Sequence, residues 1–459
     1  MSALDLLIIG GGAAGLSAAA SARKFGLAVA LVDERPAPGG NFYAGIAGPK
    51  TDAVFAADHA RGAALLARAR AAVIDSATTA WRVDRDGQCF VLGATGTTRR
   101  IIAKRILVAT GAMERPVPIP GSTLPGVMYA GAAQVMLKSA ALVPSGRVVL
   151  VGSGPLLLLV AKQLAALGAP PVAVVETTPP MGLGATLRQL PAAMNAPAML
   201  VKGIGLQRAI GKAGIRRYRQ AVGVSVAGDV YAEGVSFSDA QGRHDIAADL
   251  VLLHDGVIPN DHVTRQLGCA AVWNASQHAF APVVDRWGET SLAGFFAAGD
   301  CTGIWGAQAA ELSGEIAALE IARQLGFLTK GERDQRARRP LRQLRRQRAF
   351  RPFLEARFPP VLSRAASAAD NTVICRCENV TTGEIRLAVA QGATGPSQLK
   401  SFTRCGMGPC QGRSCAMAAA EIMATALGRS IAEIGRHDIR APLKPIPLGR
   451  VAAALEAAE

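Results

Sequence analysis

The residues best suited to chemistry are five cysteines gathered in the last fifth of the chain. One residue separates Cys375 from Cys377, and four residues separate Cys410 from Cys415. Thiolates on two short loops are suitable ligands for a zinc ion or a [2Fe–2S] cluster. We therefore expect Cys375, Cys377, Cys410 and Cys415 to bind a metal centre. Cys405 precedes Cys410 by the same four-residue gap, so spacing does not exclude it as a ligand.

A nucleotide-binding motif stands at the other end of the chain. Gly10, Gly12 and Gly15 form G-x-G-x-x-G between an apolar run typical of a buried strand and an alanine-rich stretch typical of a helix. Such glycines permit a tight turn and a close approach of a pyrophosphate, which the helix N-terminus then binds. Asp33 ends the second expected strand and is placed to bind ribose hydroxyls, with Glu34 as the alternative. The residues expected to bind this first nucleotide are Gly10, Gly12, Ala14, Gly15, Asp33, Glu34 and Gly40.

Two later stretches complete a recognisable set. Thr110 and Gly111 follow an apolar strand and precede a proline-rich exit, whereas Gly299 and Asp300 follow a second apolar strand. Together with the first motif, they resemble the flavin-domain signatures of the flavoproteins with two dinucleotide-binding domains, which include glutathione and thioredoxin reductases. The resemblance implies FAD as cofactor and assigns Asp300 to the ribityl chain, a role that suits a carboxylate because it accepts hydrogen bonds from hydroxyls. A simple helix N-cap is the alternative for Asp300.

The opening pattern is repeated near residue 150 with one defect. Gly152 and Gly154 occupy the first two glycine positions, but Leu157 replaces the third glycine. A leucine there pushes the helix away from the strand. Glu176 ends the next expected strand, where an acid that binds ribose would stand. Gly152, Gly154 and Glu176 are therefore candidates for a second nucleotide site, which is open to NAD(P)H, to another adenine nucleotide, or to no ligand at all.

These motifs predict an α/β fold that resembles glutathione reductase and ends in a small helical [2Fe–2S] domain. The first and third flavin signatures flank the repeated motif, so the FAD domain is expected to be split by an inserted domain. The expected divisions are residues 1–116 and 282–326 for the FAD domain, 117–281 for the degenerate nucleotide-binding domain, 327–369 for an arginine-rich linker, 370–430 for the [2Fe–2S] domain and 431–459 for a C-terminal tail.

Charge is concentrated in the expected linker. The chain of 459 residues has a formal net charge of +16, and residues 333–351 hold nine arginines and one acid, Asp334. Such a run can bind nucleic acid or an anionic membrane, but no nucleic-acid motif accompanies it. A solvated helix, or a surface that faces an acidic partner chain, is the favoured interpretation. No signal peptide or transmembrane segment is evident, so we expect a soluble cytoplasmic protein.

The sequence lacks the motifs of several enzyme classes, which excludes some reactions. Disulfide reductases need a redox cysteine pair beside the flavin, yet Asn41, Phe42 and Tyr43 follow Gly40, and no C-x-x-C occurs in the sequence. The histidines show no spacing typical of a metal site, and no Ser/His/Asp arrangement is supported. Catalytic residues therefore stay unassigned.

The chain as a whole resembles one group of proteins. The Cys-x-Cys and Cys-x4-Cys pairs resemble the bacterioferritin-associated-ferredoxin-like [2Fe–2S] domain. Combined with the flavin signatures, they resemble the α (B-type) subunits of heteromeric bacterial dehydrogenases: opine oxidases, hydroxyproline or proline dehydrogenases, and hydrogen cyanide synthase. The resemblance implies an electron-transfer subunit that holds FAD and [2Fe–2S]. It also implies a β subunit that carries a second flavin and the substrate site, and leaves open a small third subunit.

Two other functions remain open at this stage. One is a self-contained NAD(P)H-dependent reductase, in which the inserted domain binds the reductant. The other is a non-catalytic assembly subunit whose metal centre is structural. The sequence does not name the substrate among opines, hydroxyproline, proline and glycine.

Overall fold

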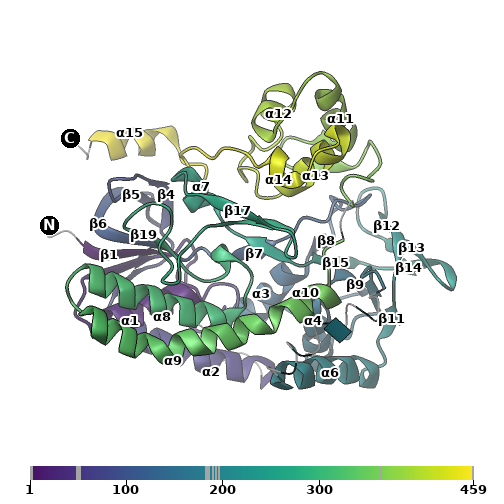
Figure 1. The fold of residues 1–459 in the computed structure, drawn as a ribbon. Helices are drawn as coiled ribbons and strands as arrows, with labels where there is room; N and C mark the ends of the chain where they lie inside the picture. The colour runs from purple at the N-terminus through teal and green to yellow at the C-terminus, as the bar shows by residue number, and fades with distance from the viewer. Residues whose placement is uncertain are drawn as a thin grey trace.

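The computed structural model describes residues 4–47, 53–180, 197–361 and 364–456, together with positions 184, 187–188, 191 and 194. Within these ranges no helix is both long enough and apolar enough to cross a membrane. Two sheets, each with helices packed on it, lie side by side, and a small helical unit rests on one side of them (Figure 1). The first sheet is mixed, because β5 (Gln88–Leu92) is antiparallel to both β4 (Thr79–Val83) and β6 (Thr98–Val108), and the second is parallel.

The first sheet holds both ends of the expected FAD domain. Its order is β3-β2-β1-β6-β5-β4, and β19 pairs in parallel with β6. The central strand β1 lies between β2 and β6. The first glycine turn follows directly at its carboxyl end. The strands are β1 (Leu4–Ile9), β2 (Val29–Val32), β3 (Val73–Asp75), β4 (Thr79–Val83), β5 (Gln88–Leu92), β6 (Thr98–Val108) and β19 (Phe295–Ala297).

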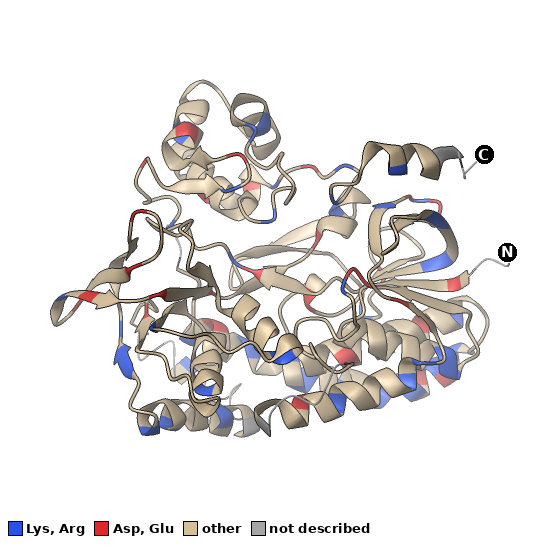
Figure 2. Cartoon of the chain, turned by 180° about the vertical axis from the view of Figure 1, so that it is seen from behind, with Lys and Arg blue, Asp and Glu red and all other residues tan. Residues whose placement is uncertain are grey.

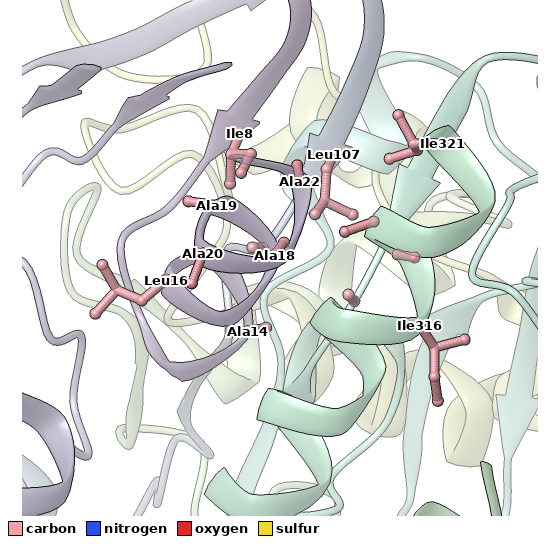
Figure 3. Packing of buried hydrophobic residues seen from close by; sticks show 14 of the residues in the cluster. Ile8, Ala14, Leu16, Ala18, Ala19, Ala20, Ala22, Leu107, Ile316 and Ile321 are labelled. Carbon is pink, nitrogen blue, oxygen red and sulfur yellow. The ribbon is translucent and has the colours of Figure 1, made fainter. Parts of the chain in front are cut away.

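Small residues let two helices of this domain pack closely. Helix α1 (Ala13–Lys24) buries alanines against α8 (Ala307–Gln324), and Figure 3 shows Ala14 and Ala18 facing the helix that carries Ile316 and Ile321. A Cβ on Gly314 of α8 would lie only 2.1 Å from the backbone oxygen of Ala14. The two halves of the FAD domain, far apart in sequence, are therefore joined through one core. Helix α2 (Ala56–Ala69), preceded by η1 (Ala53–Phe55), also packs on α1.

The inserted domain repeats this arrangement around a second sheet. Its order is β11-β10-β9-β15-β8, and all neighbours are parallel. A separate antiparallel sheet, β12-β13-β14, packs on one of its faces through a shared apolar core. The elements are β8 (Val127–Tyr129), α3 (Ala130–Ala140), β9 (Val148–Ser153), α4 (Pro155–Ala166), β10 (Ala173–Glu176), α6 (Pro197–Lys212), β11 (Arg216–Tyr218), β12 (Val222–Ala227), β13 (Gly234–Asp239), β14 (Gly242–Ala247) and β15 (Leu250–Asp255).

An antiparallel pair of strands connects the two domains. β7 (Ala112–Glu114) leaves the FAD domain and pairs with β16 (Val257–Pro259), which returns to it. The return continues through α7 (His262–Gln266), β17 (Ala271–Asn274), β18 (Ala279–Pro282) and, after β19, η2 (Asp300–Thr302).

The arginine-rich run is a helix that packs on the FAD domain. α9 (Lys330–Ala349) lies along α8, and a capping box between Thr329 and Glu332 starts it. Arg333 is buried, forms an ion pair with Glu320 and stacks on Trp287 at 4.0 Å. The segment therefore both links the domains and contributes to the FAD-domain core. Figure 2 shows many blue Lys and Arg positions along the helical layer that contains it. The short α10 (Arg351–Arg357) follows.

The C-terminal unit has its own apolar core, to which Cys375, Cys405 and Cys415 contribute. Beyond it, the tail returns to the FAD domain, where Ala454 packs with Trp81 and Phe90; Figure 1 shows α15 beside β4–β6. The elements are β20 (Val373–Cys375), β21 (Val380–Thr381), α11 (Thr382–Ala390), α12 (Pro396–Thr403), α13 (Ala416–Leu427), α14 (Ile431–Ile434) and α15 (Leu448–Glu456).

Candidate cofactor sites

The first glycine turn has the geometry that a nucleotide-binding turn requires. Gly10 adopts φ +111°, and a Cβ there would lie 2.4 Å from the backbone oxygen of Ala109. A Cβ on Gly15 would lie 1.9 Å from the oxygen of Gly10, and one on Gly40 would lie 2.9 Å from Cα of Gly12. Larger residues would therefore block the turn. The first backbone N–H groups of α1 remain available for an anion.

The two acids at the end of β2 differ in their surroundings. The Asp33 carboxylate accepts hydrogen bonds from the backbone N–H of Gly11 at 2.6 Å and of Arg35 at 2.8 Å. Burial nevertheless raises its pKa. The Glu34 side chain is 50% exposed and forms an ion pair with Lys444 of the C-terminal tail. Asp33 thus fixes the turn from inside, and Glu34 has the more accessible carboxylate for a ribose. The assignment of either acid to ribose stays a prediction.

Thr110 and Gly111 bind the segment that returns from the inserted domain. The Thr110 hydroxyl donates to the backbone oxygen of Asn260 at 2.7 Å, and the Asn260 N–H donates to the oxygen of Gly111 at 2.9 Å. These bonds attach the second flavin signature to the residues just before α7.

Asp300 lies at the start of η2, close to α1. A Cβ on the preceding Gly299 would lie 2.8 Å from Cβ of Ala14. Oδ1 of Asp300 accepts from the backbone N–H groups of Trp305 at 2.9 Å and Gly306 at 3.0 Å, and burial raises the pKa of the carboxyl. Gly306, not Asp300, occupies the N-cap position of α8. Oδ2 has no hydrogen-bond partner among the described residues, so one oxygen remains for a polyol. The glycine turn and this carboxylate fit FAD.

The second glycine turn is occupied by the protein's own groups. Gly152 adopts φ +136°, and the ring of His254 lies 3.3 Å from where a Cβ of Gly154 would stand. The Glu176 carboxylate, expected at a ribose, accepts from Nε of Arg217 at 2.8 Å. Leu157, 1% exposed, is part of the core beneath α4.

A residue from beyond the FAD domain also reaches this edge of the second sheet. Nε of Arg364 lies 2.9 Å from Oδ2 of the buried Asp255, and its Nη2 donates to Thr177 at 3.0 Å. Asp255 ends β15 and Thr177 follows β10, so Arg364 spans the carboxyl ends of strands on either side of β9. These contacts support a structural role or a ligand other than NAD(P)H. Nucleotide binding by Gly152, Gly154 and Glu176 stays a prediction.

The cysteines form a group of three and a neighbouring pair. The sulfur atoms of Cys375, Cys405 and Cys415 lie within 4.8 Å of one another, and all three residues are buried. Cys377 and Cys410 are more exposed, and the thiol of Cys410 influences the ionisation of Cys377. Cys405, which the spacing did not exclude as a ligand, therefore lies in the tightest group together with two of the four predicted ligands. The equal spacing on either side of Cys410 was the signal for it.

The donor chemistry of the group fits a metal centre. Hydrogen bonds from the thiols of Cys405 and Cys415 lower the pKa of Cys375 to about 2, so Cys375 is disposed to be a thiolate, the form that binds metals. Five sulfur donors within two short loops are enough for zinc or [2Fe–2S]. Which four of them are ligands stays a prediction.

The loop that carries these cysteines rests on α7. Nε2 of His262 donates to the backbone oxygen of Gln411 at 3.1 Å. Asp261 forms ion pairs with Arg265 of α7 and with Arg436 of the C-terminal unit. Because Asn260 is bonded to Thr110 and Gly111, a short continuous segment connects the second flavin signature to the cysteine loop. Sequence reasoning missed His262, since no local pattern marks a contact between residues so far apart.

Comparison with known proteins follows this division of the chain. The model of the pyridine nucleotide-disulphide oxidoreductase family matches residues 4–324, and that of the sarcosine oxidase A3 domain matches residues 369–455. The A subunit of opine oxidase from Agrobacterium tumefaciens (strain Ach5) is 42% identical, over 98% of this chain and 91% of that protein. The HcnB subunit of hydrogen cyanide synthase from Pseudomonas aeruginosa is 33% identical, over 96% of this chain and 97% of that protein.

Solved structures agree on the fold. L-proline dehydrogenase from P. horikoshii superimposes with a TM-score of 0.69 and 21% identity, over 98% of this chain and 79% of that chain. Thioredoxin reductase from T. acidophilum superimposes with a TM-score of 0.53 and 22% identity, over 71% of this chain and 99% of that chain. The first similarity spans almost the whole chain and so includes the C-terminal unit.

Proposed function

Because the chain belongs to the pyridine nucleotide-disulphide oxidoreductase family and is related along almost its whole length to opine oxidase A subunits, we propose that it is the subunit of a heteromeric dehydrogenase that carries FAD and [2Fe–2S]. Family membership makes it an FAD-dependent oxidoreductase. The proposed complex oxidises the C–N bond of an amino acid or opine, in the class of hydroxyproline, proline, opines or glycine. A β subunit with its own flavin holds the substrate, and a small third subunit is compatible with this arrangement.

One observation carries the proposal: three buried thiols lie together in a unit that is docked beside the second flavin signature. A redox dithiol of the disulfide-reductase kind is absent, because the sequence contains no C-x-x-C and residues 41–43 hold no cysteine. Electrons from a flavin therefore need another exit, and the cysteine group is the metal-binding candidate in the described part of the chain.

The chain's own residues contribute binding and orientation. When bound, a flavin accepts electrons in pairs and a [2Fe–2S] cluster passes them singly, which suits a junction between substrate oxidation and a one-electron acceptor. Gly10, Gly12 and Gly15 would leave room for the pyrophosphate of FAD, and Oδ2 of Asp300 would be placed to accept a hydrogen bond from its ribityl chain. His262 and Asp261 hold the cysteine loop against the FAD domain.

The relatives' names support the partner part of the proposal. The opine oxidase and hydrogen cyanide synthase relatives are both named as subunits. The engagement of Glu176 by Arg217 and the position of His254 over Gly154 argue against NAD(P)H as the electron donor. We therefore propose that the flavin of the partner subunit supplies the electrons.

An anaerobic titration tests this function. The chain is purified with and without the product of its neighbouring gene and mixed with amino acids, opines or NAD(P)H, while flavin absorbance and the iron–sulfur EPR signal are recorded. We expect reduction by one amino acid or opine only when the partner is present. Rapid reduction of the isolated chain by NADH would replace the proposal with the self-contained reductase.

A further inference from the structure

A buried histidine without hydrogen bonds lies beside the cysteine loop. His437 is 1% exposed, and neither of its ring nitrogens has a hydrogen-bond partner among the described residues. Leaving a buried polar group unsatisfied costs about 1–3 kcal/mol. Folded proteins keep few such groups, and those they keep need a specific explanation.

The ring is packed against two glycines of the loop that carries Cys405, Cys410 and Cys415. A Cβ on Gly406 would lie 3.0 Å from Nε2 of His437, and one on Gly412 would lie 3.7 Å from Nδ1. The backbone of Cys405 makes a weak contact with the imidazole that falls short of hydrogen-bond geometry, and the charge of Cys375 also acts on the ring. Both ring nitrogens therefore face the segment that brings the thiols together.

The backbone around the histidine is fixed from both sides. Nη1 of Arg265 donates to the backbone oxygen of His437 at 3.3 Å, and Arg436 forms an ion pair with Asp261. On the other side, Nζ of Lys400 donates to the backbone oxygen of Asp438 at 3.2 Å. Because these contacts anchor the segment to both α7 and α12, the backbone that carries the ring cannot move away from the loop without breaking them.

We propose that His437 donates an N–H hydrogen bond to a sulfur atom of the metal centre held by the cysteine group, and so raises the reduction potential of that centre. The inference rests on the proposed function, since it needs a redox-active centre. Reduction adds negative charge, and a hydrogen bond to sulfur stabilises the more negative state. The same bond would satisfy the orphaned imidazole. His437 is thus a positioning and tuning residue, not a ligand.

A potentiometric titration followed by EPR tests the inference on the full chain with its partner. His437→Leu removes the donor at similar volume, His437→Met is a second donor-free variant, and His437→Gln keeps an N–H. Loss of a hydrogen bond to a charged group corresponds to about a tenfold change in equilibrium. We expect the donor-free variants to shift the potential negatively by about 59 mV, the one-electron equivalent of tenfold, and His437→Gln to stay near the wild type.

His244→Leu is the control. His244 lies on β14 of the inserted domain, where its Nε2 is 2.8 Å from Oδ1 of Asp239, and it does not contact the cysteine loop. We expect an unshifted potential. A wild-type potential in His437→Leu and His437→Met would overturn the inference and leave a packing role. Loss of iron with altered g values in all three His437 variants would overturn it in favour of direct ligation. If the wild-type protein itself shows no iron–sulfur EPR signal, the proposed function is overturned as well.

Discussion

Individual glycines and acids determine whether the first turn can receive a cofactor. Gly15 permits α1 to contact the turn at Gly10, because any side chain there would collide with a backbone oxygen. Asp33 holds the same turn through the N–H of Gly11. Glu34 pairs with Lys444, and Oδ2 of Asp300 has no hydrogen-bond partner among the described residues, while its Oδ1 accepts from Trp305 and Gly306. Which of these carboxylates binds a ligand stays a prediction.

Substituting Gly15 tests the turn directly. Gly15→Ala places a methyl group 1.9 Å from the oxygen of Gly10, so α1 must move away from the strand. We expect loss of bound flavin absorbance and about 1–3 kcal/mol lower free energy of unfolding, as for other overpacked sites. Gly331→Ala in α9, where a Cβ meets nothing within 4 Å, is the control and should keep its flavin. Full flavin occupancy in Gly15→Ala would contradict this geometry.

The cysteine group gives a second prediction at this scale. Cys415 belongs both to the predicted ligand set and to the observed group of three. We expect Cys415→Ser to lose iron and acid-labile sulfide while circular dichroism shows a folded chain. Cys89→Ser, a buried cysteine in the β-sheet core of the FAD domain, is the control and should retain its iron. Unchanged iron in Cys415→Ser would exclude this group as the metal site.

Elements rich in charge also contribute to packing. α9 directs Arg333 inward to Glu320 and Trp287, whereas Arg338 and Arg339 face solvent. The exposed arginines fit a surface for an acidic partner, and the buried one fastens the helix to α8. One helix therefore serves the fold with one face and is available for assembly with the other.

Replacing the buried arginine should destabilise the FAD domain. Glu320 keeps Arg323 in Arg333→Met, so we expect a loss of about 1–3 kcal/mol, the cost of one hydrogen bond to a buried charge. Arg338→Met should change the free energy of unfolding by less than about 0.5 kcal/mol, as surface substitutions do. Equal effects of the two variants in urea denaturation would show that Arg333 is not part of the core.

The same pair predicts a pH dependence. Burial opposes ionisation of Glu320, but hydrogen bonds from Arg323 and Arg333 outweigh it and lower its pKa. A lowered pKa contributes stability above the unfolded value of about 4.3, and that stability disappears as the pH falls through the folded value. The difference between wild type and Arg333→Met should therefore be largest at neutral pH and narrow below about pH 4. A difference that grows on acidification would contradict the pairing.

At the scale of the whole molecule, the C-terminal unit is attached to the FAD domain through α7 and the tail. Asp261 pairs with Arg436, and the N–H of Leu443 donates to the backbone oxygen of Trp81 at 2.7 Å. These contacts keep the cysteine loop beside the segment that carries the second flavin signature. The proposed electron transfer between the two sites would depend on this attachment.

Weakening the attachment should be visible without any activity measurement. Arg436→Met removes one ion pair of Asp261 and should accelerate amide hydrogen exchange in α7 and in the loop from Cys410 to Cys415. Arg440→Met, on an exposed arginine of the same segment, is the control. Exchange that is equally slow in both variants would mean that Arg436 does not fasten the domains.

The sequence predicted the family resemblance and the fold because they depend on local patterns. The glycine turns and the strand–turn signatures are encoded within short windows of the sequence. The engagement of Glu176 by Arg217, the approach of Arg364 and the orphaned ring of His437 depend on residues brought together only by folding. No periodicity or spacing marks such pairs, and the structure was needed to find them.

Cofactor analysis of the purified chain tests the central claim most directly. Iron, acid-labile sulfide, zinc and FAD are measured on protein prepared anaerobically with its partner. The proposal predicts about two iron atoms, about two sulfides and about one FAD per chain, as one [2Fe–2S] cluster and one flavin require. Stoichiometric zinc without sulfide, or a chain without FAD, would contradict it.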